Sequence, residues 1–186
     1  RRRRFCARCF CFADSGSNGG VSLNIRAIRP EDSRLDVSRI YEESWRWAYR
    51  GIVPRQYLDA IPAGHWAAFL DSPGIFTLVA EDGGELVWTA SFCASRFADY
   101  PGMGELVSLY LLPRCAGKGI GKALMDAAAA GLKSMGFSRM FLWVLEDNGR
   151  ARRFYEKARF RLGPGILNDE ICGKALRELQ YVKELA

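Results

Sequence analysis

The sequence predicts a single α/β domain in which a mixed sheet is flanked by helices. Stretches with the two-residue period of strands alternate along the chain with amphipathic stretches of helical spacing. From Leu111 to Met125 an apolar strand runs through a glycine-rich loop into an amphipathic helix. With 186 residues, 49% of them hydrophobic and 12% aromatic, the chain is long enough to fill one core.

Turn and capping residues divide the first half of the chain into short elements. Ser33 begins an approximate capping box, so Ser33 or Asp32 is expected to cap a helix that ends before Gly51 and Pro54. The sequence Asp82-Gly83-Gly84 predicts a hairpin turn. The apolar stripe of the first helix is expected to comprise Leu35, Ile40, Ser44, Trp47 and Ala48. The expected elements are a strand at 23–28, helices from 33, at 55–60 and at 63–70, and strands at 75–80, 85–94 and 104–112.

The second half of the chain predicts two helices among three strands. Gly136 is expected to be the left-handed cap of the helix that follows the loop, and Asn148 or Asp147 to cap the next helix. Gly163-Pro164-Gly165 predicts a loop between the last two strands. The helix that follows the loop is expected to bury an apolar stripe of Ile120, Leu124, Ala128, Leu132 and Met135. The expected elements are helices at 120–135 and 148–158 and strands at 139–145, 160–162 and 170–183.

The glycine-rich loop predicts a site for a pyrophosphate. Gly117, Gly119 and Gly121 let a ligand approach the backbone, and the first N–H groups of the next helix have no partner within it. The helix dipole favours an anion there, and Lys118 and Lys122 add positive charge. The spacing excludes a P-loop and a dinucleotide fingerprint. A glycine-rich turn without a ligand is the alternative.

Three segments in order resemble the GNAT superfamily of N-acetyltransferases. They are the strand at 104–113, the loop with Gly119 and Gly121, and the Asn-x-x-Ala-x-x-Phe-Tyr-Glu-Lys segment from Asn148. Ala116 stands where the family has Gln or Arg, and Arg159 where it has Gly. The resemblance implies a mostly antiparallel sheet splayed between strands 4 and 5, with the pantetheine arm of acetyl-CoA in the gap. The implied acetyl-CoA contacts are Leu109, Tyr110, Leu111, Ala116, Gly117, Lys118, Gly119, Ile120, Gly121, Lys122, Asn148, Tyr155 and Lys157.

The same resemblance implies two catalytic residues. Tyr155 matches a tyrosine that lies beside the cofactor sulfur, which makes it the candidate acid for the departing thiolate. Glu105 matches a glutamate that acts as a base through water, and a structural ion pair is its alternative role. An oxyanion donor is expected near Leu111, where the family strand carries a bulge. Asn148 could bind the pantetheine arm or cap its helix.

The predicted function is acetyl transfer from acetyl-CoA to a primary amine of a small molecule or peptide, by direct attack in a ternary complex. A non-catalytic acyl-CoA sensor is the alternative, and a homodimer could form. The acceptor cannot be read from the sequence. Four aromatic residues could either shape the acceptor pocket or belong to the core: Trp45, Trp47, Tyr49 and Trp88. Three arginines could either bind an acidic acceptor or form a solvated face: Arg46, Arg50 and Arg96.

The charge and the cysteines limit other functions. Residues 1–20 hold five of the 27 basic residues and one of the 21 acidic ones, which leaves 21–186 with a net charge of +2. Specific nucleic-acid binding is therefore not expected, and 1–20 is interpreted as a disordered or non-native basic leader before one domain at 21–186. Neither a metal site nor a membrane span is expected, and the scattered cysteines indicate reduced thiols and a cytoplasmic location.

Overall fold

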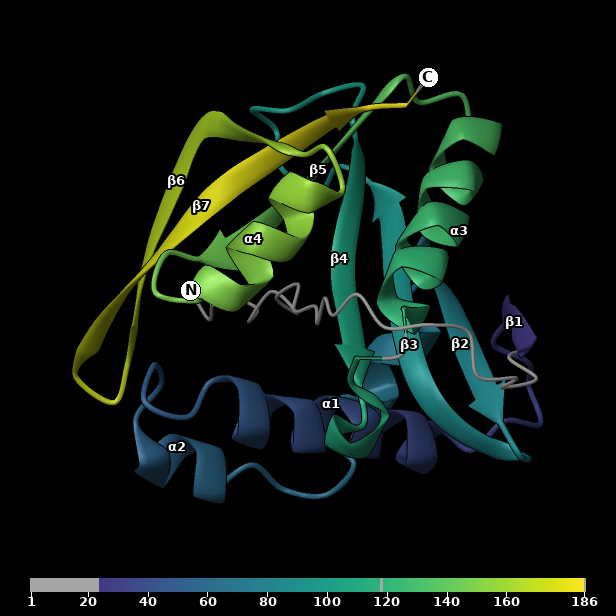
Figure 1. Ribbon diagram of the computed structural model, residues 1–186, viewed down its shortest axis with the longest axis vertical. Helices are drawn as coiled ribbons and strands as arrows, with labels where there is room; N and C mark the ends of the chain where they lie inside the picture. Colours follow the sequence, from purple (N-terminus) through teal and green to yellow (C-terminus); the bar gives the residue numbers. More distant parts are fainter. Residues whose placement is uncertain (1–23, 118, 186) are drawn as a thin grey trace.

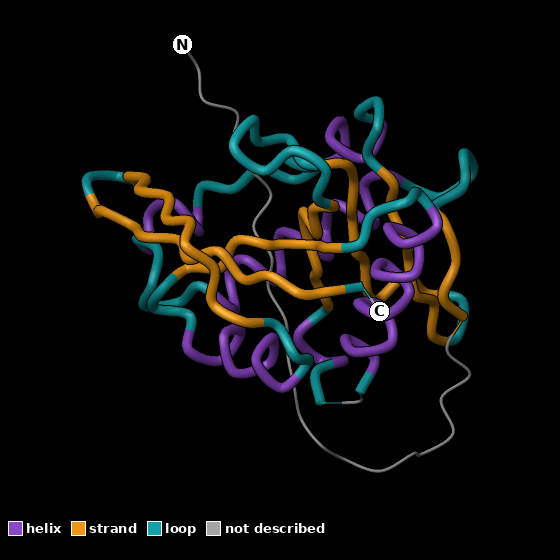
Figure 2. The backbone as a smooth tube through the Cα atoms, turned by 90° about the horizontal axis from the view of Figure 1, so that it is seen from above, coloured by secondary structure: helices purple, strands orange, loops and turns teal. Residues whose placement is uncertain are grey.

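One mixed sheet with helices on both faces makes up the fold (Figures 1 and 2). The computed structural model describes residues 24–117 and 119–185, so the predicted leader lies outside the described residues. Within them, seven strands form a sheet in the order β1-β2-β3-β4-β5-β7-β6. Only β4 and β5 run parallel, and the other neighbours are antiparallel. The predicted mixed, mostly antiparallel sheet is confirmed.

The elements follow the predicted order along the chain. In the first half they are β1 (Asn24–Ala27), α1 (Arg34–Ala48), α2 (Arg55–Asp59), the 3-10 helix η1 (Ala67–Asp71), β2 (Phe76–Asp82), β3 (Glu85–Ala94) and β4 (Gly104–Leu111). In the second half they are the 3-10 helix η2 (Pro113–Cys115), α3 (Ile120–Ser134), β5 (Arg139–Leu145), α4 (Gly149–Lys157), β6 (Arg161–Ile171) and β7 (Lys174–Glu184). α1 packs on one face of the sheet, while α3 and α4 lie on the other (Figure 1).

α1 begins as predicted, but its buried face differs from the predicted stripe. The Ser33 hydroxyl accepts the Asp36 N–H at 3.2 Å, which confirms Ser33 as the N-cap. The prediction for Leu35 is wrong, because this side chain is 64% exposed. Val37 is fully buried, and two residues along a helix turn a side chain to the opposite side.

The helix predicted at 63–70 is replaced by the shorter η1. Buried polar groups of α1 bind the backbone of this segment: Glu42 Oε1 accepts the Gly64 N–H at 2.8 Å, and Ser38 Oγ accepts the Trp66 N–H at 2.9 Å. These amides are therefore taken by side chains before a regular helix can use them. Only Ala67–Asp71 continues as a 3-10 helix.

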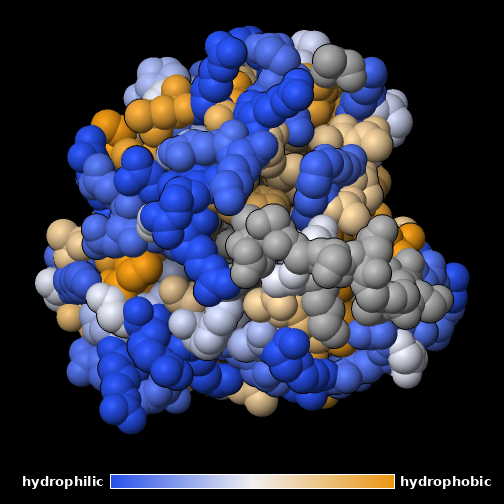
Figure 3. Space-filling model, in the orientation of Figure 1, coloured by the Kyte–Doolittle hydropathy of each residue, from blue (hydrophilic) through white to orange (hydrophobic). Residues whose placement is uncertain are grey.

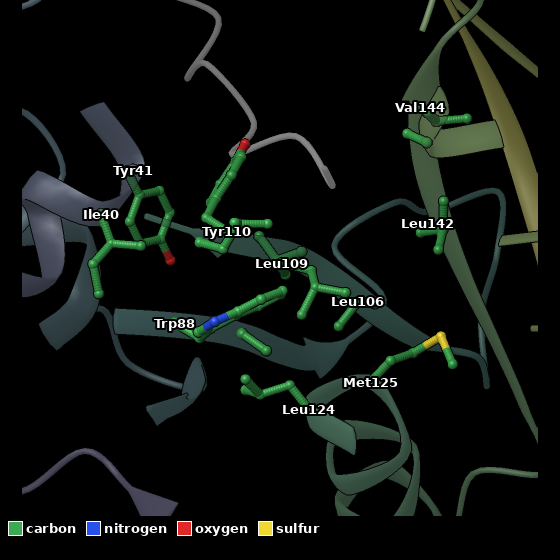
Figure 4. Packing of buried hydrophobic residues seen from close by; sticks show 14 of the residues in the cluster. Ile40, Tyr41, Trp88, Leu106, Leu109, Tyr110, Leu124, Met125, Leu142 and Val144 are labelled. Carbon is green, nitrogen blue, oxygen red and sulfur yellow. The ribbon is translucent and has the colours of Figure 1, made fainter. Parts of the chain in front are cut away.

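α3 packs very closely on the centre of the sheet. A Cβ on Gly104 would lie 2.7 Å from Leu132 Cδ2, and a Cβ on Gly131 would lie 2.5 Å from Phe92 Cζ. Glycine at both positions lets the helix approach the strands to a distance that a side chain would prevent. Figure 4 shows the side chains that fill the contact, among them Trp88, Leu106, Leu109, Leu124 and Met125.

The C-terminal end of α3 follows the prediction in one of two respects. Gly136 has φ of +92°, so the expected left-handed cap is confirmed. Met135, predicted to belong to the buried stripe, is 40% exposed. The reason is that Met135 is the C-cap residue, past the last turn that contacts the sheet.

The loop predicted at Gly163-Pro164-Gly165 is part of a strand. β6 runs without interruption through these residues and pairs with β7, and the hairpin turns at Cys172 and Gly173, which both have positive φ. The pairing shifts between Leu162 and Ile166, so the glycines and the proline form a bulge. Proline is tolerated there because β6 is the edge strand and its outer N–H groups need no ladder partner.

Candidate active site

The sheet divides between β4 and β5, as predicted. The two strands pair only at Gly104 with Met140 and at Glu105 with Phe141, and beyond this point they diverge (Figure 1). The glycine-rich loop follows the carboxyl end of β4, and Asn148 follows the carboxyl end of β5. The opening therefore has the loop at one strand end and the start of α4 at the other, an arrangement that commonly holds a ligand in α/β sheets.

The loop has the backbone that an anion site requires. Gly117 and Gly119 adopt positive φ of +85° and +72°, and Gly119 is the N-cap of α3 without a side-chain cap bond. The first turn of α3 carries no acidic side chain, so the partial positive charge of the helix end is not neutralised there. Lys122 is exposed and binds Asp126 at 2.5 Å, one turn further on. Lys118 lies outside the described residues.

The end of β4 is fixed from the α1 side by Ser44, a residue that sequence reasoning placed only in the apolar stripe. The Ser44 hydroxyl accepts the Leu111 N–H at 3.0 Å and also bonds the carbonyl oxygen of Leu111. The hydroxyl of Tyr110, the residue before Leu111, accepts a hydrogen bond from Nε1 of Trp45, the residue after Ser44, at 3.0 Å. A polar residue in an otherwise buried stripe was the available signal.

The bulge expected near Leu111 lies earlier in β4. Ser91 pairs with Ser108 and the next residue, Phe92, pairs with Leu106, so Val107 is the extra residue. Leu111 instead pairs regularly with Trp88 and is held by Ser44. The bulge therefore lies close to Glu105 and to the point where β4 and β5 part.

α4 carries Asn148 and Tyr155 on its buried side. Asn148 Oδ1 accepts the Ala151 N–H at 3.1 Å, so Asn148 caps the helix as predicted, and its Nδ2 is buried without a partner among the described residues. Tyr155 is fully buried between Phe154 and Phe160, whose ring centroids lie 5.3 and 5.5 Å away. The amide nitrogen of Asn148 can therefore serve a ligand while the oxygen caps the helix.

Tyr181, which sequence reasoning missed, joins α4 to β7. Its hydroxyl donates to Glu156 Oε1 at 2.7 Å and accepts from Arg152 Nε at 3.1 Å. Burial raises the pKa of Tyr181, although the hydrogen bond from Arg152 opposes the shift. The bonds fix the rotation of the helix that presents Tyr155. No motif marks Tyr181 in the sequence, because its partners are distant along the chain.

Arg159 has a left-handed backbone where the resembling family has glycine. Its φ is +67°, and it follows the C-terminal end of α4. The Arg159 N–H donates to the Glu156 carbonyl, and the Phe160 N–H donates to the Tyr155 carbonyl at 2.9 Å, which closes the helix. The tight turn therefore forms with arginine, at a backbone cost of about 1–2 kcal/mol.

Glu105 is buried and forms an ion pair with Arg96. Its side chain is 1% exposed, and its carboxylate accepts Nη2 of Arg96 at 2.6 Å, Nε at 2.9 Å and the backbone N–H at 3.2 Å. The structural ion pair that the sequence left open is thus present. The Arg96 side chain is 32% exposed, but its guanidinium is paired with this carboxylate.

The aromatic residues proposed for an acceptor pocket lie mainly in the core. Trp45, Tyr49 and Trp88 are at most 2% exposed, and Trp47 is half-buried beneath the Arg150 guanidinium, 5.0 Å from the ring centroid. A different aromatic group stands beside Glu105, because Phe141 pairs with it across β4 and β5. This group comprises Phe97, Tyr100, Phe141 and Trp143.

The residues that the structure describes contain no cluster of three histidine, cysteine or acidic side chains arranged to bind a metal ion. None of their helices has the length and apolar character needed to cross a membrane.

Comparison with known proteins gives the family from sequence and a shared fold from structure. Residues 36–160 match the sequence model of the acetyltransferase (GNAT) family. The uncharacterized N-acetyltransferase YuaI of Bacillus subtilis is 30% identical over 163 residues, 84% of this chain and 90% of that protein. A spermidine N(1)-acetyltransferase of Thermoplasma acidophilum is 26% identical over 153 residues, 76% of this chain and 90% of that protein. The crystal structure of PaiA N-acetyltransferase from Thermoplasma acidophilum in complex with coenzyme A shares the fold, with a TM-score of 0.66, 24% identity and coverage of 84% of this chain and 98% of that one.

Proposed function

Since the chain belongs to the acetyltransferase (GNAT) family, we propose that it transfers the acetyl group of acetyl-CoA to a primary amine of a small molecule or peptide by direct attack in a ternary complex. GNAT homologues bind CoA or acetyl-CoA. One observation carries the proposal for this chain: the divergence of β4 from β5 lies between the glycine-rich loop and the start of α4.

The residues of the opening fit the parts of acetyl-CoA in order. The loop amides around Gly119 and the start of α3 would hold the diphosphate, since they combine left-handed glycine with an unneutralised helix end. Asn148 Nδ2 would donate to the pantetheine arm. Lys122 and Lys157 are exposed and would attract the phosphates from solvent. When bound, acetyl-CoA supplies an activated thioester, whose C–S bond breaks as the amine forms the amide.

Tyr155 would give its hydroxyl proton to the departing thiolate. Its support is its place on the buried side of α4, with the helix rotation fixed by Tyr181. The test is Tyr155→Phe, which keeps the ring and removes the proton donor. We expect kcat to fall about 10²–10⁴-fold with little change in the KM for acetyl-CoA. An unchanged kcat across pH would refute this role.

Glu105 would receive the amine proton through water near the bulge of β4. Arg96 donates hydrogen bonds to its carboxylate, and the adjacent aromatic side chains would favour a cationic acceptor. Two variants separate this role from the structural one, because Arg96→Met breaks the same ion pair and leaves the carboxylate. We expect Glu105→Gln to lower kcat/KM at least tenfold more than Arg96→Met. Equal losses in rate and thermal stability would show that Glu105 is structural.

The acceptor is best identified by following the release of free CoA thiol with a panel of amines. The panel includes polyamines, because one relative is a spermidine N(1)-acetyltransferase, together with amino acids, aminoglycosides and peptides. Release with one class and not the others would define the substrate. Silence across the panel, with acetyl-CoA bound, would support the alternative of a non-catalytic acyl-CoA sensor.

A further inference from the structure

A groove lies on the α3 and α4 face, beyond the glycine-rich loop. It has a volume of about 740 Å³ and lies between the C-terminal half of α3, the end of β7 and residues 159–162. We refer to it as the α3–β7 groove. On α3 the lining runs from Asp126 to Lys133, which is about 9–20 Å of helix beyond Ile120, and no residue of the glycine-rich loop lines the groove. The groove is therefore separate from the proposed diphosphate site.

The charged side chains of the groove are mostly cations. Its lining includes Lys133, Arg159, Arg161 and Lys183, against two acids, Asp126 and Glu184. Asp126 is already paired with Lys122 at 2.5 Å. Figure 3 shows this face, on which hydrophilic side chains predominate over α4 and less hydrophilic ones lie over much of α3. The groove thus carries an excess of positive charge, although residues 21–186 as a whole are nearly neutral.

Three of these cations lack a counter-ion within the described part of the chain. The ion pairs of the described residues include none formed by Arg159, Arg161 or Lys183. Lys183 is half-buried, with its ammonium 5.5 Å from the centroid of the Phe160 ring. Burial lowers the pKa of Lys183, and the nearby negative charge of Asp126 opposes the shift. An anion would compensate these groups.

The backbone of Arg159 supplies an independent reason to assign a role to the groove. The residue keeps a left-handed φ of +67° at a position where glycine would be unstrained. Its side chain lines the groove. The strain is explained if the guanidinium is needed there, because one guanidinium can donate two parallel hydrogen bonds to two oxygens of the same phosphate.

The lining also has an apolar part. Ala129 and Ala130 of α3 face Leu162, Val182 and Leu185. Leu162 is 60% exposed, so its side chain is available to an apolar group of a ligand. The volume falls within the range of about 300–1,000 Å³ that is common for small-molecule sites.

We propose that the α3–β7 groove binds a small molecule that joins a phosphate monoester to an apolar body, with Arg159, Arg161 and Lys183 holding the phosphate. The apolar body would cover Leu162 and the alanines of α3. The site is distinct from the acetyl-CoA site, so both ligands are expected to bind together.

The test is calorimetric titration of the full chain, saturated with CoA, with 1-naphthyl phosphate. Inorganic phosphate lacks the apolar body and 1-naphthol lacks the phosphate, so both should bind at least tenfold more weakly. Arg161→Gln should weaken 1-naphthyl phosphate at least tenfold. Arg55→Gln is the matched control, because it removes an exposed cation of α2 on the opposite face and should leave binding unchanged.

Arg159→Gly excludes unfolding as the cause of a loss. This variant should weaken 1-naphthyl phosphate at least tenfold and raise the Tm of the free protein, because glycine relieves the strained backbone. The proposal is overturned by any of four results. They are no saturable binding at millimolar ligand, displacement of the ligand by CoA, equal weakening by Arg55→Gln, or full affinity in Arg159→Gly and Arg161→Gln. None of these results depends on acetyl transfer.

Discussion

Two glycines at opposite ends of α3 allow the proposed diphosphate site to be tested against a matched control. Gly119, the N-cap, has φ of +72°, and Gly136, beyond the C-terminal end, has φ of +92°. A Cβ at either position would meet no atom within 4 Å. Gly119→Ala and Gly136→Ala therefore impose the same kind of backbone strain without a clash, and only the first change lies where a ligand is proposed.

The expected loss of stability is small and similar for both variants. Alanine in the left-handed region costs about 1–2 kcal/mol, and its more restricted unfolded chain returns about 0.4–1 kcal/mol. The net loss of about 0–1.6 kcal/mol corresponds to a Tm about 0–6 °C lower for a domain of this size. At Gly119 the new methyl group would also hold the diphosphate away from the amides. Loss of one charge-assisted hydrogen bond, about 1.5–3 kcal/mol, raises the Kd for acetyl-CoA about 10–150-fold.

The assay is calorimetric titration of wild type and both variants with acetyl-CoA, with Tm measured in parallel. We expect Gly119→Ala to lose affinity and Gly136→Ala to keep wild-type affinity within about threefold, well below the loss set by one hydrogen bond. Equal affinities for the two variants would refute the assignment of the loop as the diphosphate site.

Two further variants test the folded frame. Arg26 holds the pKa of Asp32 below its usual value by hydrogen bonds at 2.6 and 2.8 Å, so the stability this carboxylate contributes is present above its unfolded pKa and is lost as the pH falls. Asp32→Asn should lower the free energy of unfolding by about 1.5–3 kcal/mol at neutral pH, with the difference shrinking below about pH 3.9 in denaturation curves. Gly131→Ala gains about 1 kcal/mol of helix propensity but overpacks Phe92, which is stacked on Phe76, at about 1–3 kcal/mol. Urea denaturation should therefore show a net loss, and a gain would mean that Phe92 moves aside freely.

The sequence predicted most of the frame because local signals and the fold agree there. Ser33, Gly136 and Asn148 end or begin helices as expected, since each contributes a local capping interaction. Leu35 was misplaced because its position in the stripe depended on which face of α1 meets the sheet, and this is decided by tertiary contacts. Gly163 and Gly165 read as a loop because an edge strand tolerates residues that an inner strand would not.

The candidate site was predictable where one segment supplies it and hidden where distant segments meet. The loop around Gly119 and the cap at Asn148 follow from local sequence, and the structure places them at the ends of the two diverging strands. The hydrogen bond between Ser44 and Leu111 joins residues 67 positions apart, and those between Tyr181 and α4 join residues at least 25 positions apart. No local pattern marks such contacts, because a single polar residue in an apolar run can have many partners.

The most direct test of the account is a crystal structure of this chain with acetyl-CoA. We predict diphosphate oxygens within about 2.7–3.2 Å of amide nitrogens between Cys115 and Ala123, and the pantetheine arm between β4 and β5. A diphosphate bound elsewhere on the protein, with these amides still facing solvent, would contradict the account.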